Sequence, residues 1–455
     1  MGSKLHCRLL LAFFVSLLLW FTGFARADNP PTAPPATRAA EAIPIEEQGF
    51  DPAEHLFGEV FGLRERLFQH GISIDPYLIV DYSKNFLGGL DTHGDSFRQR
   101  FNLPVEINTD KFFGLHGGTI FAVYQLQHGG NASHTLTGDA QNFSFGTDAD
   151  GRSQLGQLWY QQKFFNDTLR LRLGKMDGNA DFDVLDNAQE FLNNSFSTSP
   201  TLGLMPSFPD NGTGIQLFYE PANGMYAGAA VFDGSGARGV RTGEIGPKHF
   251  FDRSDDLFFI SEIGARYKAH IGDRHFPGKV SLGGWWDTNH FDRLDSAGRQ
   301  TGTGGVYLTL DQVLWKPFRQ LPIPAGPPGA SPTERPEQEE YPGGVAASFS
   351  VSWADPTVNR IDANALLGLS WTGAITNRPI DVLGAGATWA HFSSDAGTRD
   401  PYELALETFY RIRFTQWVSL KPDLQYIIHP NGSEDVGQTV RNNALVMTLR
   451  LEVAF

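Results

Sequence analysis

The feature that most constrains the fold is a two-residue alternation that recurs along the chain and continues to its last residue. In the final segment, ALVMTLRLEVAF (444–455), apolar residues occupy every second position up to Phe455, and Arg450 and Glu452 stand between them. Such a pattern places apolar side chains on one face of a β-strand and polar side chains on the other. Because lipid cannot satisfy an unpaired strand edge, we expect this strand to pair with the first one and close a barrel.

About sixteen segments show this alternation, each over roughly 9–13 residues, which is the weak signature of transmembrane β-strands. They are 72–83, 97–109, 116–128, 155–165, 168–176, 213–220, 224–232, 258–270, 277–287, 304–315, 345–353, 364–373, 380–391, 403–415, 417–428 and 443–455. Short and long connections alternate, as do the periplasmic turns and outer loops of outer-membrane barrels. The sequence therefore predicts an all-β membrane protein, an antiparallel outer-membrane barrel of about sixteen strands with a short N-terminal helix.

Two connections need separate treatment. The Pro-rich stretch 316–344 is long where a short turn is due, so it is either an enlarged periplasmic turn or a point where the strand count slips by one. The longest outer connection contains 183–197, in which Leu185, Ala188 and Leu192 have the spacing of one face of a short helix. If this loop folds into the bore it narrows the channel, and the alternative is an ordinary surface loop.

The first 27 residues have the pattern of a secretory signal peptide. Lys4 and Arg8 precede the apolar run 9–21, and Ala25-Arg26-Ala27 has the small-x-small form of a cleavage site. A short N-terminal membrane anchor is the alternative.

After the signal, residues 28–48 are rich in Pro and Ala and predict a flexible tether. The barrel domain then covers 49–455 and begins with an amphipathic helix at about 54–70 that ends at Gly71.

Charge and cysteine content limit the partners. Without the signal peptide the chain has 33 basic and 51 acidic residues, a formal net charge of −18, which argues against nucleic acid as a partner. Cys7 is the only cysteine and lies in the signal, so we expect no disulfide. We expect no metal and no cofactor, because the usual metal, phosphate-binding and nucleophile motifs are absent from the sequence.

If the apolar face of each strand meets lipid, the polar face lines a water-filled bore. We expect the following charged side chains to line the substrate path: Arg98, Arg100, Glu106, Arg170, Arg172, Glu407, Arg411, Arg413, Lys421, Asp423, Arg450 and Glu452. Sugar hydroxyls both donate and accept hydrogen bonds, so a wall that mixes cationic donors with carboxylate acceptors suits them. The alternative is that these charges form ion pairs that stiffen the wall of a general water channel.

The strands 403–415 and 417–428 are separated by Gln416 alone, which predicts an antiparallel pair with a fixed register. Glu407 should then lie opposite Gln425, Arg411 opposite Lys421, Arg413 opposite Ser419 and Asp423 opposite Phe409.

Several longer stretches match a known family. They are GLRERLFQHGI (62–72), LWYQQKFFNDTLRLRLGKMD (158–177), FLNNSFSTSPT (191–201), PSFPDNGTGIQLFYEP (206–221) and LKPDLQYIIHPNG (420–432). With these stretches the chain resembles the carbohydrate-selective porins of the OprB type, although Gly58-Glu59-Val60-Phe61-Gly62 and the Pro-rich insert depart from the family's usual pattern. The resemblance implies a sixteen-stranded barrel through which sugars diffuse.

We therefore expect an outer-membrane channel of a Gram-negative bacterium for the facilitated diffusion of monosaccharides or other small sugars into the periplasm, and not an enzyme. The alternatives are a general or anion-preferring porin on the same fold, an outer-membrane hydrolase and a secreted β-rich binding protein. The expected partners are small sugars, outer-membrane lipid and the barrel-assembly machinery, whose recognition signal the terminal aromatic residue resembles. Association as a homotrimer is a further possibility.

Overall fold

The computed structural model of the protein describes residues 52–147, 151–245, 256–271, 274–296, 298–317, 343–433 and 442–455. The expected signal peptide, 1–27, and the expected tether, 28–48, lie outside these residues.

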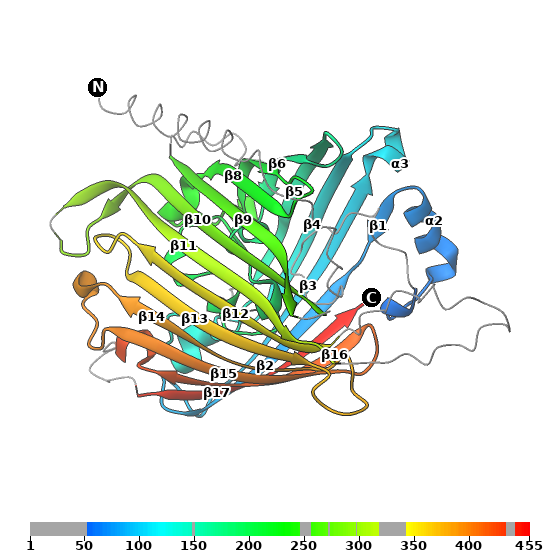
Figure 1. Ribbon diagram of the computed structural model, residues 1–455. Coiled ribbons are helices and arrows are strands. Elements are labelled where there is room, and N and C mark those ends of the chain that lie inside the picture. The colour runs from blue at the N-terminus through cyan, green and yellow to red at the C-terminus, as the bar shows by residue number, and fades with distance from the viewer. Residues whose placement is uncertain are drawn as a thin grey trace, which may run out of the picture.

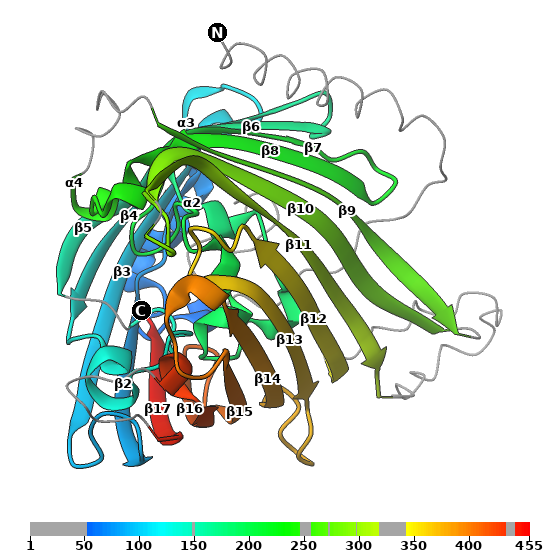
Figure 2. The same ribbon diagram turned by 90° about the vertical axis from the view of Figure 1, so that its left-hand side faces the viewer.

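Sixteen antiparallel strands, β2 to β17, form one closed barrel (Figure 1, Figure 2). Their bounds are β2 (Tyr77–Leu87), β3 (Asp95–Asn108), β4 (Gly118–His128), β5 (Arg152–Phe164), β6 (Leu169–Met176), β7 (Gly212–Tyr219), β8 (Met225–Asp233), β9 (Leu257–Ile271), β10 (Arg274–Asp292), β11 (Arg299–Trp315), β12 (Gly344–Ala354), β13 (Ile361–Thr372), β14 (Val382–Phe392), β15 (Tyr402–Arg413), β16 (Val418–Ile428) and β17 (Ala444–Ala454). Each strand pairs with the next, and β17 pairs with β2. The predicted fold class and strand number are confirmed.

The start of the barrel differs from the expectation. The predicted strand 72–83 is interrupted at Asp75-Pro76, because proline has no N–H to donate to a ladder. A short strand, β1 (Ile72–Ile74), pairs with β3 before the break, and β2 begins after it at Tyr77.

The N-terminal helix is also shorter than expected. Instead of a helix at 54–70, the segment has 3-10 turns at Pro52–Glu54 and Val60–Gly62, followed by α2 (Leu63–Gln69). Gly58, Phe61 and Gly62 have φ angles of 54°, 54° and 74°, which are left-handed and end any right-handed helix. Two other short helices, α3 (Thr109–Phe113) and α4 (Thr242–Ile245), lie in connections.

The Pro-rich connection does not change the strand count. β11 and β12, on either side of it, pair antiparallel, for example Leu310 with Phe349, with one register shift between Val313 and Trp315. Strand order therefore places the end of β11 and the start of β12 at the short-turn end of the barrel, where β2 begins and β17 ends (Figure 1). We call this the inner end and the opposite one, with the longer connections, the outer end.

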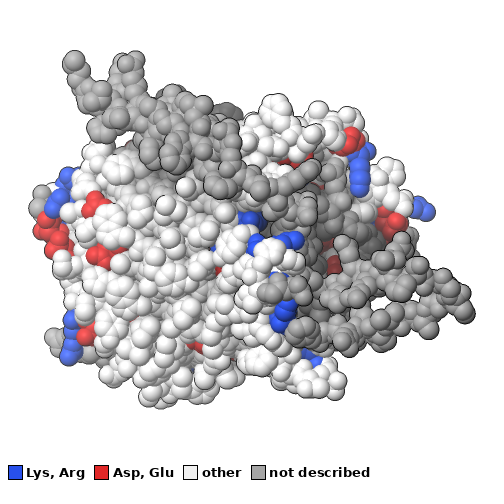
Figure 3. All heavy atoms as spheres, in the orientation of Figure 1, with Lys and Arg blue, Asp and Glu red and all other residues white. Residues whose placement is uncertain are grey.

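The two faces of the wall have the predicted character. On β15, Leu406 is 42% exposed on the outside, whereas its neighbour Glu407 is 3% exposed on the inside. Charged side chains on the face seen in Figure 3 lie mostly near its left edge and on its right side, with a broad, mainly uncharged area between. No helix among the described residues is long and apolar enough to cross a membrane.

A change on the outer face tests this assignment. Leu367, at the middle of β13, is 52% exposed and points outward. We expect Leu367→Arg to reduce the free energy of unfolding in lipid by about 2–4 kcal/mol, the cost of a cation near the bilayer midplane. Urea unfolding in lipid vesicles measures this, with Leu367→Ile as the control that keeps the site apolar. Equal stability of the two variants would contradict a lipid-facing Leu367.

Candidate functional site

The connection between β6 and β7, residues 177–211, folds into the barrel and is called the inward loop below. Its residues Leu185, Ala188 and Leu192 are 2%, 1% and 0% exposed. They pack in the interior as the sequence suggested, but they do not lie on one helix: Ala188 belongs to a 3-10 turn (Asp186–Ala188), Leu185 precedes this turn, and Leu192 lies between it and the next turn (Asn194–Phe196). The inward loop therefore narrows the bore.

Glu407 of the barrel wall holds the inward loop by its backbone. Its two carboxylate oxygens accept hydrogen bonds from the main-chain N–H groups of Leu192 (2.5 Å) and Asn193 (3.1 Å). Lys421 on the adjacent strand donates to the main-chain oxygen of Glu190 at 2.9 Å. The loop is thus fixed to β15 and β16 through contacts that do not depend on its own side chains.

Asp311 on β11, four strands from β15 around the wall, also holds the inward loop by its backbone. It accepts hydrogen bonds from the N–H groups of Asp186 (2.7 Å) and Asn187 (3.2 Å). On β9, Glu262 accepts from the N–H of Asp183 at 3.1 Å. Burial raises the pKa of Asp183 to about 7, and the nearby charge of Glu262 acts in the same direction.

The acidic side chains of the inward loop pair with cations of the wall. Asp181 bonds Arg170 at 2.8 Å and Arg172 at 2.6 Å. Burial alone would raise the pKa of Asp181, but the two arginines outweigh it and hold that pKa below its ordinary value. Both arginines also stack on aromatic rings, Arg170 on Phe218 and Arg172 on Trp159, at 4.5 Å and 4.3 Å from the ring centroids.

On the opposite wall, Glu190 lies between two cations. Its carboxylate forms an ion pair with Arg411 through one oxygen and with Lys421 through the other, the latter at 2.8 Å. The side chains of all three residues are nearly buried, at 10% exposure or less.

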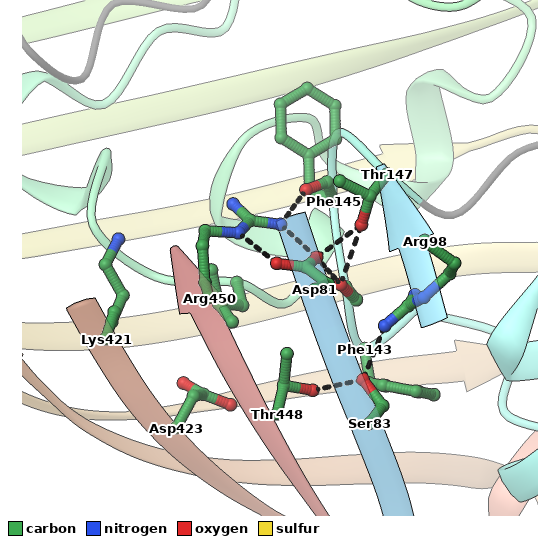
Figure 4. A network of polar contacts seen from close by, with 12 residues as sticks. Asp81, Ser83, Arg98, Phe143, Phe145, Thr147, Lys421, Asp423, Thr448 and Arg450 are labelled. Carbon is green, nitrogen blue, oxygen red and sulfur yellow. Dashed lines mark hydrogen bonds and ion pairs between the residues drawn. The ribbon is translucent and has the colours of Figure 1, made fainter. Parts of the chain in front are cut away.

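The strands that close the barrel carry a further ion pair, shown in Figure 4. Arg450 of β17 binds both oxygens of Asp81 of β2, at 2.9 Å and 2.8 Å. Ser144 and Thr147, from the connection between β4 and β5, donate to the same carboxylate, and Arg450 also donates to the main-chain oxygen of Phe145. A second loop is therefore anchored over the seam.

Loops also come together at the outer end. Glu403 of β15 accepts hydrogen bonds from the N–H groups of Ala140, Gln141 and Asn431. A cavity of about 580 Å³ lies among these loops, with Leu90, His134, Asp139, Leu204, Asn359, Arg360 and Asn431 in its lining. It forms a vestibule of mixed polar and apolar character.

All twelve charged residues proposed from the sequence occupy inner positions of their strands. Nine of them are buried, and Arg170, Arg413 and Glu452 are partly exposed. The predicted register of β15 and β16 is confirmed at Glu407 with Gln425, Phe409 with Asp423 and Arg413 with Ser419. The structure joins Arg170 to Arg172 through Asp181, and Arg411 to Lys421 through Glu190. It does not leave Glu407 open to the bore, since its oxygens bind the inward loop.

Several interior residues were missed. The alternation could have identified Asp81 in YLIVDYS and the amides Gln125 and Gln127 in VYQLQH, because they occupy the polar positions of their strands. Asp181 and Glu190 had no such signal, because a loop without regular periodicity gives no face assignment.

A few buried donor atoms of the wall lack a partner in the protein. Among the described residues, Arg100 Nε, Asn102 Nδ2 and Arg413 Nη2 have no hydrogen-bond partner in the protein. The described part of the chain also has no group of three or more His, Cys, Asp or Glu residues arranged to hold a metal ion. The polar groups of the described interior therefore act through hydrogen bonds and ion pairs.

Residues 92–455 match the family model described as "Carbohydrate-selective porin, OprB family". The chain belongs to this family. It is therefore an outer-membrane β-barrel of Gram-negative type and a channel for sugars. The predicted family, localisation and general function are confirmed.

Relatives agree with this assignment. Porin B of Pseudomonas aeruginosa is 23% identical over 456 residues, which cover 92% of this chain and 94% of the relative. Porin AaxA of Chlamydia abortus is 36% identical over 80 residues, 17% of this chain and 18% of that one. The high-pH structure of Pseudomonas putida OprB superposes with a TM-score of 0.72 at 18% identity, over 90% of this chain and all of that chain.

The hold of Glu407 on the inward loop of this porin can be tested. Hydrogen bonds to a charged group contribute about 1.5–3 kcal/mol each, and Glu407→Ala removes two of them. We expect a higher and noisier single-channel conductance, because the loop no longer stays against the wall. The control is Glu452→Ala, since Glu452 accepts a hydrogen bond from Ser419 of the neighbouring strand. A quiet, unchanged conductance for Glu407→Ala would show that the other anchors suffice.

Proposed function

We propose that small neutral sugars, monosaccharides in particular, cross this porin along the inner wall beside the inward loop, and that the path includes those of the twelve inner charged residues that do not hold a loop, as Glu407 does. The observation that carries this proposal is that the cations of the wall are matched by acids. Arg170 and Arg172 share Asp181, Arg411 and Lys421 share Glu190, and Arg450 binds Asp81. Such a wall offers many polar atoms without a large net charge, and this suits an uncharged polyol better than an ion.

Donors without a protein partner lie on the same wall. Arg100 and Asn102 are inward neighbours on β3, and Arg413 stands at the inner end of β15. We infer that Arg413, whose side chain is partly exposed, binds water in the empty channel and exchanges it for a sugar hydroxyl at little cost. Transport requires such contacts to be weak enough to break again.

The general test compares solutes that differ in charge but little in size. Glucose and gluconate differ mainly by the carboxylate of gluconate. We expect liposomes containing the porin to swell faster in glucose than in gluconate with a non-permeant counter-ion. An anion that enters the bore loses hydration, and a wall whose cations are paired with acids offers little electrostatic attraction to offset that loss. Faster swelling in gluconate would instead support the anion-preferring porin.

Arg413 offers a test at one residue. We expect Arg413→Ala to weaken the block of ion current by glucose several-fold, since a charged hydrogen bond is worth up to about 3 kcal/mol. Arg413→Lys is the matched control, because it keeps the positive charge while losing the planar fork of donors. Planar-bilayer titration with glucose measures both variants. If Arg413→Ala binds glucose like the unchanged protein, the residue is not part of the path.

Three further statements belong to this proposal. The protein acts as a channel and not as an enzyme, in keeping with its family. The barrel-assembly machinery inserts it, for which the outward alternation of β17 is the support. Barrels associate as homotrimers, which crosslinking in native membranes would test.

A further inference from the structure

The inward loop carries acidic residues but no basic ones. Between residues 177 and 211 it contains no Lys and no Arg, and its acidic residues are Asp177, Asp181, Asp183, Asp186, Glu190 and Asp210. Its segment therefore brings six formal negative charges, and no positive charge, into the barrel.

Four of these six carboxylates reach cations of the wall. Besides the contacts of Asp181 and Glu190, Asp210 binds Arg152 at 2.7 Å and Asp186 lies 3.8 Å from Lys279. The wall cations in question are Arg152 of β5, Arg170 and Arg172 of β6, Lys279 of β10, Arg411 of β15 and Lys421 of β16. They come from strands on several sides of the bore, so one loop meets cations around its circumference.

The loop does not depend on these ion pairs for its position at Glu190. Glu407 accepts its backbone N–H groups at Leu192 and Asn193, and Lys421 donates to the main-chain oxygen of Glu190. Removing the Glu190 carboxylate leaves these anchors intact. The side-chain charge of Glu190 is thus separable from the fold of the loop.

We propose that the inward loop is the charge-compensating element of this porin, and that Asp181 and Glu190 limit its attraction for anions by each cancelling one of the two positive charges of the cation pair that they contact. The inference rests on the proposed function, since it explains why a wall rich in Arg and Lys conducts sugars. Without the two carboxylates, the same wall concentrates anions, because charges of one sign in a low-dielectric channel focus the potential.

Single changes of charge test this, with the reversal potential in a KCl gradient as the readout. Glu190→Gln and Asp181→Asn should each shift the permeability ratio towards chloride, and the double variant should shift it several-fold. Arg411→Gln should shift it towards potassium. Glu190→Gln combined with Arg411→Gln should return the ratio close to the unchanged value, which a purely structural role of Glu190 would not produce.

Asp186→Asn is the control within the same loop. The side chain of Asp186 is 51% exposed and its cation is more distant, so its effect should be the smallest. An unchanged reversal potential for the double variant in assembled, heat-modifiable barrels would overturn the inference. If Glu190→Gln does not assemble, Asp181→Asn and Arg411→Gln decide, and shifts of the same sign from both would overturn it.

The two levels of the proposal fail in different ways. If the charge variants behave as expected but glucose permeates no faster than gluconate in the unchanged protein, the sugar path is wrong and the compensation stands. If glucose is preferred but the reversal potential ignores Asp181 and Glu190, the sugar path stands and the compensation is wrong.

Discussion

The closure of the ring between β17 and β2 is the constraint on which the rest of the structure depends. An open strand edge would leave N–H and C=O groups without partners in lipid, at a cost of several kcal/mol for each group. The ladder from Leu445 with Leu87 to Ala454 with Tyr77 removes this cost. At the centre of this seam Arg450 lies directly opposite Asp81, so the backbone pairing is joined by a bidentate ion pair on the inside (Figure 4).

Once the wall is closed, the polar side chains on its inner face can bind only groups that lie inside the barrel. The carboxylates of Glu407, Asp311 and Glu262 each accept backbone N–H groups of the inward loop. They replace the partners that these N–H groups would otherwise find in water. Some interior charges of this porin therefore hold loops in place, and in the proposed function others face the sugar path.

The sequence could predict the strands because their period of two is local. The expected turn at Gln416 even gave the register of Glu407 with Gln425, although the connection in the structure is longer, 414–417. It could not predict the break before Tyr77 or the short α2, since a proline and left-handed glycines there override the periodicity. The sequence could not predict the partners of the inward loop either, for another reason. Leu192 and Glu407 are 215 residues apart, and no local pattern relates a loop to the wall that it meets after closure.

The paired charges also explain how a bore can be strongly polar yet suited to a neutral solute. Removing one member of a buried ion pair leaves an uncompensated charge, which is costly, whereas the intact pair contributes little net attraction for ions. Two arginines share Asp181, and an arginine and a lysine share Glu190, so each acid leaves some donor capacity on its cations. A sugar hydroxyl can accept from such a donor without exchanging charge. The number of cations for each acid thus sets how many hydrogen-bond donors the wall offers, and the ion-pair contacts limit the electric field in the bore. A porin in which these two properties vary separately can conduct sugars without favouring salts.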